Sequence, residues 1–213
     1  MYGPVIQGKL VRLRPPRVED APAMVTWFED MEVTQFLGRR NPLNLAAQNE
    51  WLDKVARDPD SVLWVIEYHG RAVGTTGIHE INWKFGRGTT GTLIGDKKVW
   101  GKGLAREVMQ LRARYAFTEL PLRKLEAAYF DGNAASGRAQ AAAGYKIVGR
   151  RREYVFAGGR WLDEILTEVL RSDWEKTQPP HPPATATSGV PAPKAREGAS
   201  PRGGEARAPR KRP

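Results

Sequence analysis

The feature that most constrains this chain is a turn with two glycines between an expected strand and an expected helix. A strand-like run covers residues 90–95, a helical pattern covers residues 103–120, and the turn reads Lys98-Val99-Trp100-Gly101-Lys102-Gly103-Leu104-Ala105. Backbone N–H groups at a helix N-terminus have no partner inside the helix and lie at the positive end of its dipole. Because glycine lacks a Cβ, Gly101 and Gly103 also let a bulky ligand approach the backbone. The turn therefore predicts an anion cradle of the kind that holds phosphates, and the alternative is a plain strand-to-helix turn.

The order of the other elements predicts a mixed sheet with helices on both faces, an α/β (α+β) architecture. Apolar runs indicate strands, and apolar residues at helical spacing indicate helices. The expected strands are residues 9–14, 61–68, 71–81, 89–94, 123–129, 145–156 and 161–170, and the expected helices are one that Asp20 caps, then residues 45–57, 103–120 and 133–143. A crossover joins the strands on either side of the 103–120 helix, so we expect these two strands to be parallel.

Composition divides the chain into a folded part and a tail. Hydrophobic residues make up 40% of the 213 residues, enough for one domain, which we expect to span residues 1–177. Residues 178–213 are rich in Pro, Ala and Arg, so this tail is predicted to be disordered. The chain has no cysteine, which excludes disulfides, thiolate nucleophiles and zinc–thiolate sites. Because neither a membrane span nor a signal-peptide pattern is present, we expect a cytoplasmic protein with no membrane partner.

The net charge of +10 is concentrated near the C-terminus. Residues 179–213 hold seven Lys or Arg and two Glu, so half of the excess lies in the tail and the folded part is only mildly basic. We therefore do not expect the fold to bind nucleic acid. Two interpretations of the tail stay open, a weak polyanion binder or a flexible solubilising extension.

Six short motifs follow one another along nearly all of the folded part. They are Leu13-Arg14-Pro15 with Glu19-Asp20-Ala21, Val33-Thr34-Gln35-Phe36-Leu37-Gly38, Trp100-Gly101-Lys102-Gly103-Leu104-Ala105 with Glu107, Asn133-Ala134-Ala135-Ser136, Gly144-Tyr145, and Arg151, Gly159 and Asp163 before Asp173-Trp174. In this order they resemble the GNAT superfamily of acetyl-CoA-dependent N-acetyltransferases, and more narrowly its RimJ/RimL-like branch. The chain departs from the family pattern at Lys98, where Arg or Gln is frequent, at Tyr145, where Phe is usual, and at Asp173, where Glu is usual.

The resemblance implies the GNAT fold, a mixed and mostly antiparallel sheet splayed between two parallel central strands. It implies transfer of an acetyl group from acetyl-CoA to a primary amine, with no metal. The cofactor's pyrophosphate is expected on the backbone of Val99, Trp100, Gly101, Lys102, Gly103, Leu104 and Ala105, with Lys98 or Lys102 adding charge. The pantetheine arm is expected along Thr92, Leu93 and Ile94, where a backbone N–H could also stabilise the oxyanion of a tetrahedral intermediate.

Catalysis also needs proton transfer, because a free alkyl amine is mostly protonated at neutral pH. The resemblance implies that Ser136 is the acid for the leaving thiolate and that Asn133 orients the cofactor; a helix-start cap is the alternative role of Ser136. Relatives place a carboxylate at the position of Val155, and we expect Glu153, two residues earlier, to lie on the same strand face and act as the base. Glu80 and His79 are the next candidates, and an ordinary surface or hydrogen-bonding role is the alternative for all three.

The acceptor stays open between a protein N-terminus and a small-molecule amine. The acidic residues Glu29, Asp30 and Glu32 could meet a cationic acceptor or form a solvated rim. An alternative function of a different class is a non-catalytic acyl-CoA-binding regulatory or scaffold protein on the same fold. We expect a monomer or a homodimer.

Overall fold

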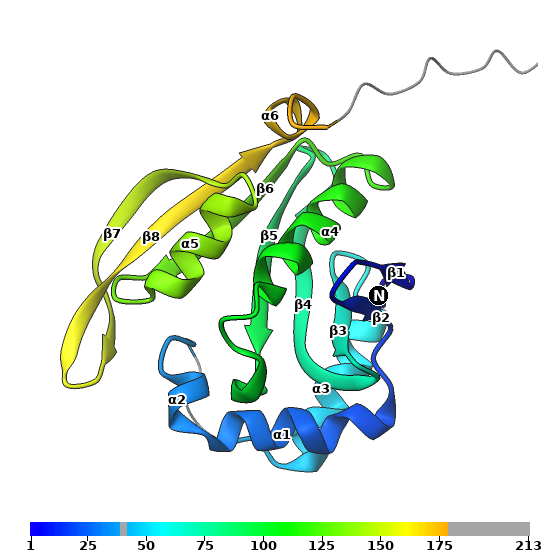
Figure 1. Ribbon diagram of the computed structural model, residues 1–213, viewed down its shortest axis with the longest axis vertical. Coiled ribbons are helices and arrows are strands. Elements are labelled where there is room, and N and C mark those ends of the chain that lie inside the picture. The colour runs from blue at the N-terminus through cyan, green and yellow to red at the C-terminus, as the bar shows by residue number, and fades with distance from the viewer. Residues whose placement is uncertain (39–41, 179–213) are drawn as a thin grey trace, which may run out of the picture. The chain divides into compact units, whose positions relative to one another are not determined.

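The computed structural model describes residues 1–38 and 42–178, which build one eight-stranded sheet with helices against both faces (Figure 1). The strand order is β1-β2-β3-β4-β5-β6-β8-β7. Neighbouring strands are antiparallel except for β5 and β6, which are parallel as predicted. No helix in the described part of the chain is long and apolar enough to cross a membrane.

The predicted strands and helices are present, with ends that differ by a few residues. The strands are β1 (Ile6–Gln7), β2 (Arg12–Arg14), β3 (Val62–Tyr68), β4 (Arg71–Asn82), β5 (Arg87–Ile94), β6 (Lys124–Phe130), β7 (Lys146–Ala157) and β8 (Arg160–Leu170). The helices are α1 (Ala21–Glu29), α2 (Met31–Thr34), α3 (Leu45–Arg57), α4 (Leu104–Thr118), α5 (Ala134–Ala142) and α6 (Arg171–Glu175), with 3₁₀ turns η1 (Val18–Asp20) and η2 (Lys97–Val99). The short elements β1, α2 and α6 were not predicted. The predicted tail, residues 178–213, lies outside the described residues except for Gln178.

Strand β3 explains why helices cover both faces, because five consecutive apolar residues of it are buried. Val62, Trp64 and Ile66 belong to the core that α4 completes, whereas Leu63 and Val65 belong to the core that α1 and α3 complete. Side chains alternate between the two faces of a strand, so a continuous apolar run needs a cover on each side.

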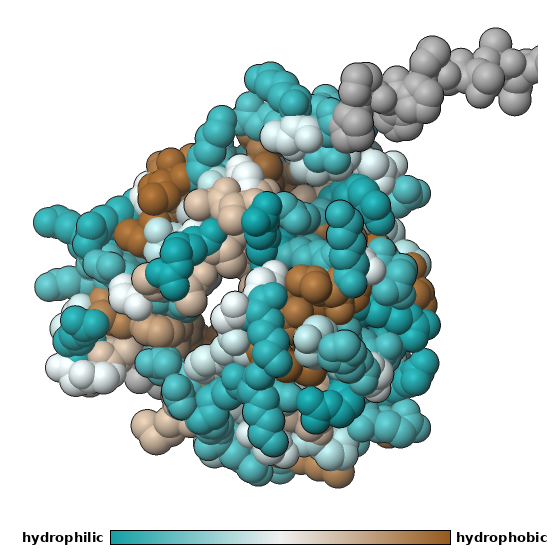
Figure 2. All heavy atoms as spheres, in the orientation of Figure 1, coloured by the Kyte–Doolittle hydropathy of each residue, from teal (hydrophilic) through white to brown (hydrophobic). Residues whose placement is uncertain are grey.

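The parallel strands β5 and β6 separate soon after they begin. Residues 87–89 of β5 pair with residues 124–126 of β6, and no later pair joins these two strands, both fully described, although β5 continues to Ile94 and β6 to Phe130. The hydroxyl of Thr90 donates to the carbonyl of Glu126 at 3.0 Å, at the branch point. The strands thus form a fork, which confirms the predicted splayed sheet. A hollow between α5 and the start of α4 is visible near the centre of Figure 2.

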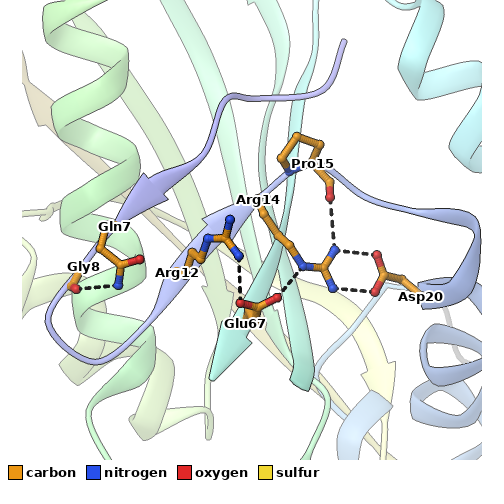
Figure 3. A network of polar contacts seen from close by, with 7 residues as sticks. All are labelled: Gln7, Gly8, Arg12, Arg14, Pro15, Asp20 and Glu67. Atoms are coloured by element: carbon orange, nitrogen blue, oxygen red, sulfur yellow. Dashed lines mark hydrogen bonds and ion pairs between the residues drawn. The ribbon is translucent and has the colours of Figure 1, made fainter. Parts of the chain in front are cut away.

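Asp20 does not cap α1 with its side chain, contrary to expectation. Its carboxylate accepts two hydrogen bonds from the guanidinium of Arg14, at 2.8 and 2.7 Å, and one from the backbone N–H of Arg17, at 2.7 Å. Arg14 also donates to Glu67 of β3 at 2.7 Å, and Arg12 donates to the second oxygen of Glu67 at 3.3 Å (Figure 3). The ion pair uses the carboxylate oxygens that a cap would need, and it ties β2, β3 and the start of α1 together.

The same contacts keep both carboxylates ionised in the folded protein. The side chains of Arg14, Asp20 and Glu67 are only 6%, 7% and 14% exposed. Burial acts to raise the pKa of Asp20, but the hydrogen bonds from Arg14 and from the Arg17 N–H outweigh it and hold the pKa below its usual value. The same balance, with Arg14 and Arg12 as donors, lowers the pKa of Glu67. Their stabilising effect is therefore fully present above the unfolded pKa values of about 4 and is lost as the pH falls through the lower folded values.

Replacing Arg14 by methionine is expected to reduce the free energy of unfolding by about 3–5 kcal/mol, because two buried carboxylates lose their shared counter-ion. Urea unfolding at neutral pH measures the loss. Arg12→Met is the matched control, since Arg12 is 39% exposed and an exposed pair contributes at most about 1 kcal/mol. The difference between wild type and the Arg14 variant should shrink as the pH is lowered from about 5 to about 3. Equal losses for the two variants would contradict the assigned network.

Candidate functional site

The loop between β5 and α4 holds its backbone open to a ligand. Asp96 accepts a hydrogen bond from the backbone N–H of Lys98 at 3.0 Å, and the Trp100 indole donates to the carbonyl of Ile94 at 2.9 Å. Gly101 and Gly103 have φ angles of 76° and 81°, where a residue with a Cβ is strained. Among the described residues, no atom lies within 4 Å of the place where a Cβ would sit on either glycine. The start of α4 is therefore accessible at its backbone.

A cleft of about 670 Å³ extends from this loop into the fork, and we call it the fork cleft. Its lining includes most of the residues that the sequence predicted for the cofactor, namely Thr92, Leu93, Ile94, Val99, Trp100, Gly101, Gly103, Leu104, Ala105, Asn133 and Ser136. Residues from β5, from the glycine loop and from α5 thus meet at one hollow. The fork therefore brings together segments that lie far apart in the sequence.

The positive charge of the fork cleft comes from residues that were not predicted. Lys98 and Lys102 are not among its lining residues, and the ammonium of Lys102 lies 5.7 Å from the centroid of the Tyr68 ring. Arg106 and Arg138 line the cleft instead. Each stands three residues, about one helical turn, after a residue of a recognised motif, and this spacing is the signal that could have found them. No group of three or more His, Asp or Glu that could hold a metal ion occurs in residues 1–38 and 42–178.

Ser136 is positioned by α5 but does not cap it. Asn133 is the cap, and its side-chain oxygen accepts from the backbone N–H of Ser136 at 3.1 Å. The Ser136 hydroxyl oxygen accepts from Nε2 of Gln140 at 3.1 Å, and buried Gln140 is fixed in turn by Thr167, whose hydroxyl donates to it at 2.5 Å. Because its oxygen accepts a bond from Gln140, the hydroxyl keeps its own hydrogen for a contact in the fork cleft.

A second hollow, of about 350 Å³, lies between the sheet and helices α1 and α3, and we call it the α1–α3 pocket. Trp27, Phe28 and Trp51 form part of its wall, and none of the described residues that line it carries a full charge at neutral pH. Residues 91–93 of β5 border both this pocket and the fork cleft. The two hollows therefore adjoin along this short piece of backbone, and Leu37 also borders both.

His79 of β4 is the titratable side chain of the α1–α3 pocket. Its ring lies over Gly77, and a Cβ added to Gly77 would lie only 2.6 Å from Nε2 of His79. Burial lowers the pKa of His79, and the positive charge of Arg112 lowers it further. The imidazole is therefore neutral at pH 7 and able to accept a proton.

The other two candidate bases border neither hollow. Glu80 is exposed and accepts a hydrogen bond from the hydroxyl of Thr89 at 3.2 Å. The expectation that Glu153 shares a strand face with Val155 is wrong, because β7 shifts its register between Arg151 and Val155 and Glu153 has a φ of 49°. Such a bulge breaks the alternation of side chains. The side chain of Glu153 is exposed.

Of the three acids at and after the end of α1, Glu29, Asp30 and Glu32, the last two are already paired with a cation. Asp30 and Glu32 contact the ammonium of Lys97 at 2.7 and 2.8 Å. Lys97 belongs to η2, so these ion pairs join α2 to the segment that precedes the glycine loop. Because Lys97 already balances part of their charge, Asp30 and Glu32 attract a cationic acceptor less strongly.

A buried guanidinium lies beside the backbone that both hollows share. Arg112 of α4 is 1% exposed, and its Nη1 donates to Thr76 Oγ1 at 2.6 Å, to the Gly91 carbonyl at 2.7 Å and to Thr92 Oγ1 at 2.8 Å. Its Nη2 donates to the Tyr145 hydroxyl at 3.2 Å.

A charged residue such as Arg112 is expected on the solvent-facing side of an amphipathic helix, but here it lies in the core. Leu104, Val108 and Arg112 follow one another at intervals of four residues, and both apolar residues are buried. Residues four apart share a helix face, so this spacing is the signal that could have placed Arg112 inside.

Glu107 of the glycine-loop motif has a structural role. Its carboxylate accepts hydrogen bonds from the backbone N–H groups of Lys9, Leu10 and Val11, at 2.5, 2.8 and 3.0 Å. The contact fastens the turn between β1 and β2 to the first turn of α4, next to the fork cleft.

Known proteins resemble this chain in both sequence and fold. A family model described as an acetyltransferase (GNAT) domain matches residues 11–146. The chain is 27% identical over 177 residues to the uncharacterized N-acetyltransferase p20 of Bacillus licheniformis, which covers 76% of this chain and 93% of that protein. It is 33% identical over 85 residues to the ribosomal protein uS5-alanine N-acetyltransferase of Escherichia coli (strain K12), over 39% of this chain and 43% of that protein.

A solved structure extends the comparison to the fold. The spermidine N-acetyltransferase from Vibrio cholerae, in complex with CoA and spermine, matches with a TM-score of 0.73 and 20% identity over 79% of this chain and 99% of that chain. The residues that match the family model include the fork and the glycine loop and make up more than half of the sequence. The chain therefore belongs to the GNAT acetyltransferases, and its relatives include a RimJ/RimL-like ribosomal-protein N-acetyltransferase.

Proposed function

We propose that this protein transfers the acetyl group of acetyl-CoA to a primary amine, with the donor in the fork cleft and the amine in the α1–α3 pocket. The observation that carries the proposal is that residues 91–93 of β5 border both hollows. A donor and an acceptor bound on the two sides of this backbone would meet there, as direct transfer requires. The acceptor is a protein N-terminus or a small-molecule amine.

The fork cleft has the features that acetyl-CoA needs. The start of α4 offers accessible backbone N–H groups, and Arg106 and Arg138 offer positive charge for phosphates. Beyond Thr89 the edge of β5 that faces β6 is unpaired within the described sheet, so the amides of a pantetheine arm could pair with it as an added strand does. The Vibrio cholerae structure, which holds CoA on the same fold, supports this assignment.

In the proposed step the amine nitrogen attacks the thioester carbonyl carbon. A C–N bond forms and the C–S bond breaks; the amine loses one proton and the leaving thiolate takes up one. His79 accepts the amine proton, directly or through a water, because it is neutral and borders the pocket. Ser136 donates to the sulfur, with its hydroxyl oriented by Gln140. Glu80 and Glu153 have no part in this proposal, since they border neither hollow.

The proposal extends to a cytoplasmic enzyme that works as a monomer or a homodimer. Size-exclusion chromatography with light scattering would decide between the two assembly states.

The full chain incubated with acetyl-CoA and a panel of amines tests the reaction. Thiol release that depends on the amine, together with an acetylated product in mass spectra, is the expected result. The alternative, an acyl-CoA-binding scaffold, gives tight CoA binding with unchanged acetyl-CoA after long incubation with both peptides and small amines.

Gly103→Ala is expected to weaken CoA binding at least about tenfold, because a Cβ would stand where the phosphates approach the start of α4. Isothermal titration with CoA measures the change. Gly159→Ala is the matched control, since Gly159 has a φ of 78° and equally open surroundings but lies in the β7–β8 turn. Both variants should lose similar unfolding free energy, about 1 kcal/mol. Unchanged CoA affinity in the Gly103 variant would contradict the loop assignment.

His79→Gln is expected to lower kcat and to remove the acid limb of its pH profile. In the wild type kcat should fall as the pH drops below the pKa of His79, which burial and Arg112 hold below about 6.5. A protonated imidazole cannot accept the amine proton. Ser136→Ala is the comparison variant, because it should lower kcat and leave that acid limb in place. An acid limb that persists in the His79 variant would assign the base to another group.

A further inference from the structure

The α1–α3 pocket has two chemically different ends. Its walls toward the helices are apolar and aromatic, with Trp27 and Phe28 from α1 and Trp51 from α3. Its floor on the sheet is polar, with His79 and Thr75 from β4 and the backbone of Gly91. A ligand that matches both ends has a polar group at one end and an apolar body at the other.

The pocket lacks what a polycation requires. A second or third ammonium group needs a carboxylate or comparable acceptor, and none of the described lining residues is acidic. The neighbouring acids Asp30 and Glu32 are bound to Lys97. The volume of about 350 Å³ is at the lower end of the range for small-molecule sites.

We infer that the acceptor is a small amine that carries a single amino group on an apolar, aromatic body. This inference rests on the proposed function. The amino group lies against His79 and the Gly91 backbone, where it meets the donor, and the aromatic ring lies among the three aromatic side chains. Aromatic rings attract one another edge to face and contribute beyond the area they bury.

Acetylation rates with phenethylamine, ethylamine, spermidine and an alanine-terminated peptide test the inference on the full chain. The kcat/KM for phenethylamine should exceed that for ethylamine about 10- to 100-fold, as burial of an aromatic ring predicts. Spermidine and the peptide should be poorer than phenethylamine. A preference for either of them would overturn the inference while leaving the transferase proposal intact, whereas no turnover of any amine would count against that proposal itself.

Variants of the pocket wall give a second readout. Trp51→Ala should reduce the preference for phenethylamine over ethylamine at least about fivefold, and Trp161→Ala, an exposed tryptophan of β8, should leave it unchanged. Gly91→Ala adds a methyl group where nothing lies within 4 Å, so it should lower kcat/KM most for the aromatic amine. Equal preference in the Trp51 variant and in the wild type would overturn the placement of the ring.

The guanidinium of Arg112 is buried, and no described residue serves as its counter-ion. None of the ion pairs among residues 1–38 and 42–178 includes Arg112, and its Nε has no hydrogen-bond partner there. Removing a charge from water is costly unless it is paired, so a buried cation bound only to neutral groups calls for an explanation.

The contact of Arg112 with Gly91 points to an explanation for this buried charge. Gly95 donates its backbone N–H to Val73 of β4, and the register of β4 and β5 is regular from there to Thr90. The backbone N–H and C=O groups of alternate residues point toward the same neighbouring strand. Those of Gly91 therefore also point toward β4, and those of Thr92 point toward the fork. The Gly91 carbonyl and the Thr92 N–H belong to one trans peptide and point in opposite directions.

We propose that Arg112 is a positioning residue that strengthens the Thr92 N–H as a hydrogen-bond donor for the developing oxyanion. Its Nη1 lies 2.7 Å from the Gly91 oxygen and 2.8 Å from Thr92 Oγ1, so it polarises this peptide and fixes its orientation. In a site of low dielectric, such a donor is worth more than in water.

The infrared band of the thioester carbonyl in bound acetyl-[1-¹³C]-CoA tests this role. Binding to the wild type should move the band to lower wavenumber than in solution. In Arg112→Met the band should return toward the free value and kcat should fall about 10- to 100-fold, with the Kd for CoA within about threefold of wild type. Arg112→Lys, which keeps the charge, should restore part of the band shift and part of kcat. Arg114→Met, at an exposed position of the same helix, is the control.

If the methionine variant does not fold, Arg112→Gln replaces it, since its amide can still donate to Gly91 without the charge. A folded neutral variant that keeps the wild-type band and kcat would overturn the role of Arg112. A wild-type protein that binds acetyl-CoA without any band shift would overturn it as well. A wild type that binds no acetyl-CoA would count against the transferase proposal instead.

Discussion

The incomplete pairing of β5 with β6 is the constraint on which the site depends. Backbone polar groups need partners when they leave water, and beyond Thr89 the sheet supplies none on the side of β5 that faces β6. The indole of Trp100 donates a hydrogen bond to the carbonyl of Ile94, and residues 91–94 border the fork cleft. The fold therefore presents an unfinished strand edge, and a ligand with amides can complete the sheet where a protein strand does not.

Strands that separate inside a core need a brace, and side chains provide it here. Thr90 reaches across to β6, and its hydroxyl is 3.2 Å from that of Tyr145. Tyr145 in turn accepts from Arg112, which also holds Thr76, Gly91 and Thr92. The family resemblance implies phenylalanine, which has no hydroxyl, at the position of Tyr145. The hydroxyl of Tyr145 therefore links the brace between β5 and β6 to the buried arginine.

Local patterns in the sequence predict the element order, the parallel pair and the glycine loop, because apolar spacing and glycine turns are local properties. The other predicted residues of the cleft follow from the family resemblance. The errors concern contacts between distant segments. Asp20 looks like a cap until Arg14 and Glu67 lie beside it, and Glu153 has the expected spacing until a bulge breaks the alternation. Arg112 is buried although its charge favours the outer side of a helix, and its spacing from buried Leu104 and Val108 is the only local signal for this.

The apolar character of the α1–α3 pocket also changes which base the proposed reaction needs. A primary amine has a pKa of about 10 in water, but an apolar pocket whose described lining residues include no carboxylate disfavours the ammonium form and lowers that pKa. The same burial and the nearby Arg112 lower the pKa of His79. Proton transfer depends on the difference between the two pKa values, and lowering the amine's value brings it toward that of the imidazole. A carboxylate at this place would stabilise the ammonium form instead. A neutral histidine in an uncharged pocket is thus a better match to this chemistry than the glutamate that the strand pattern suggested.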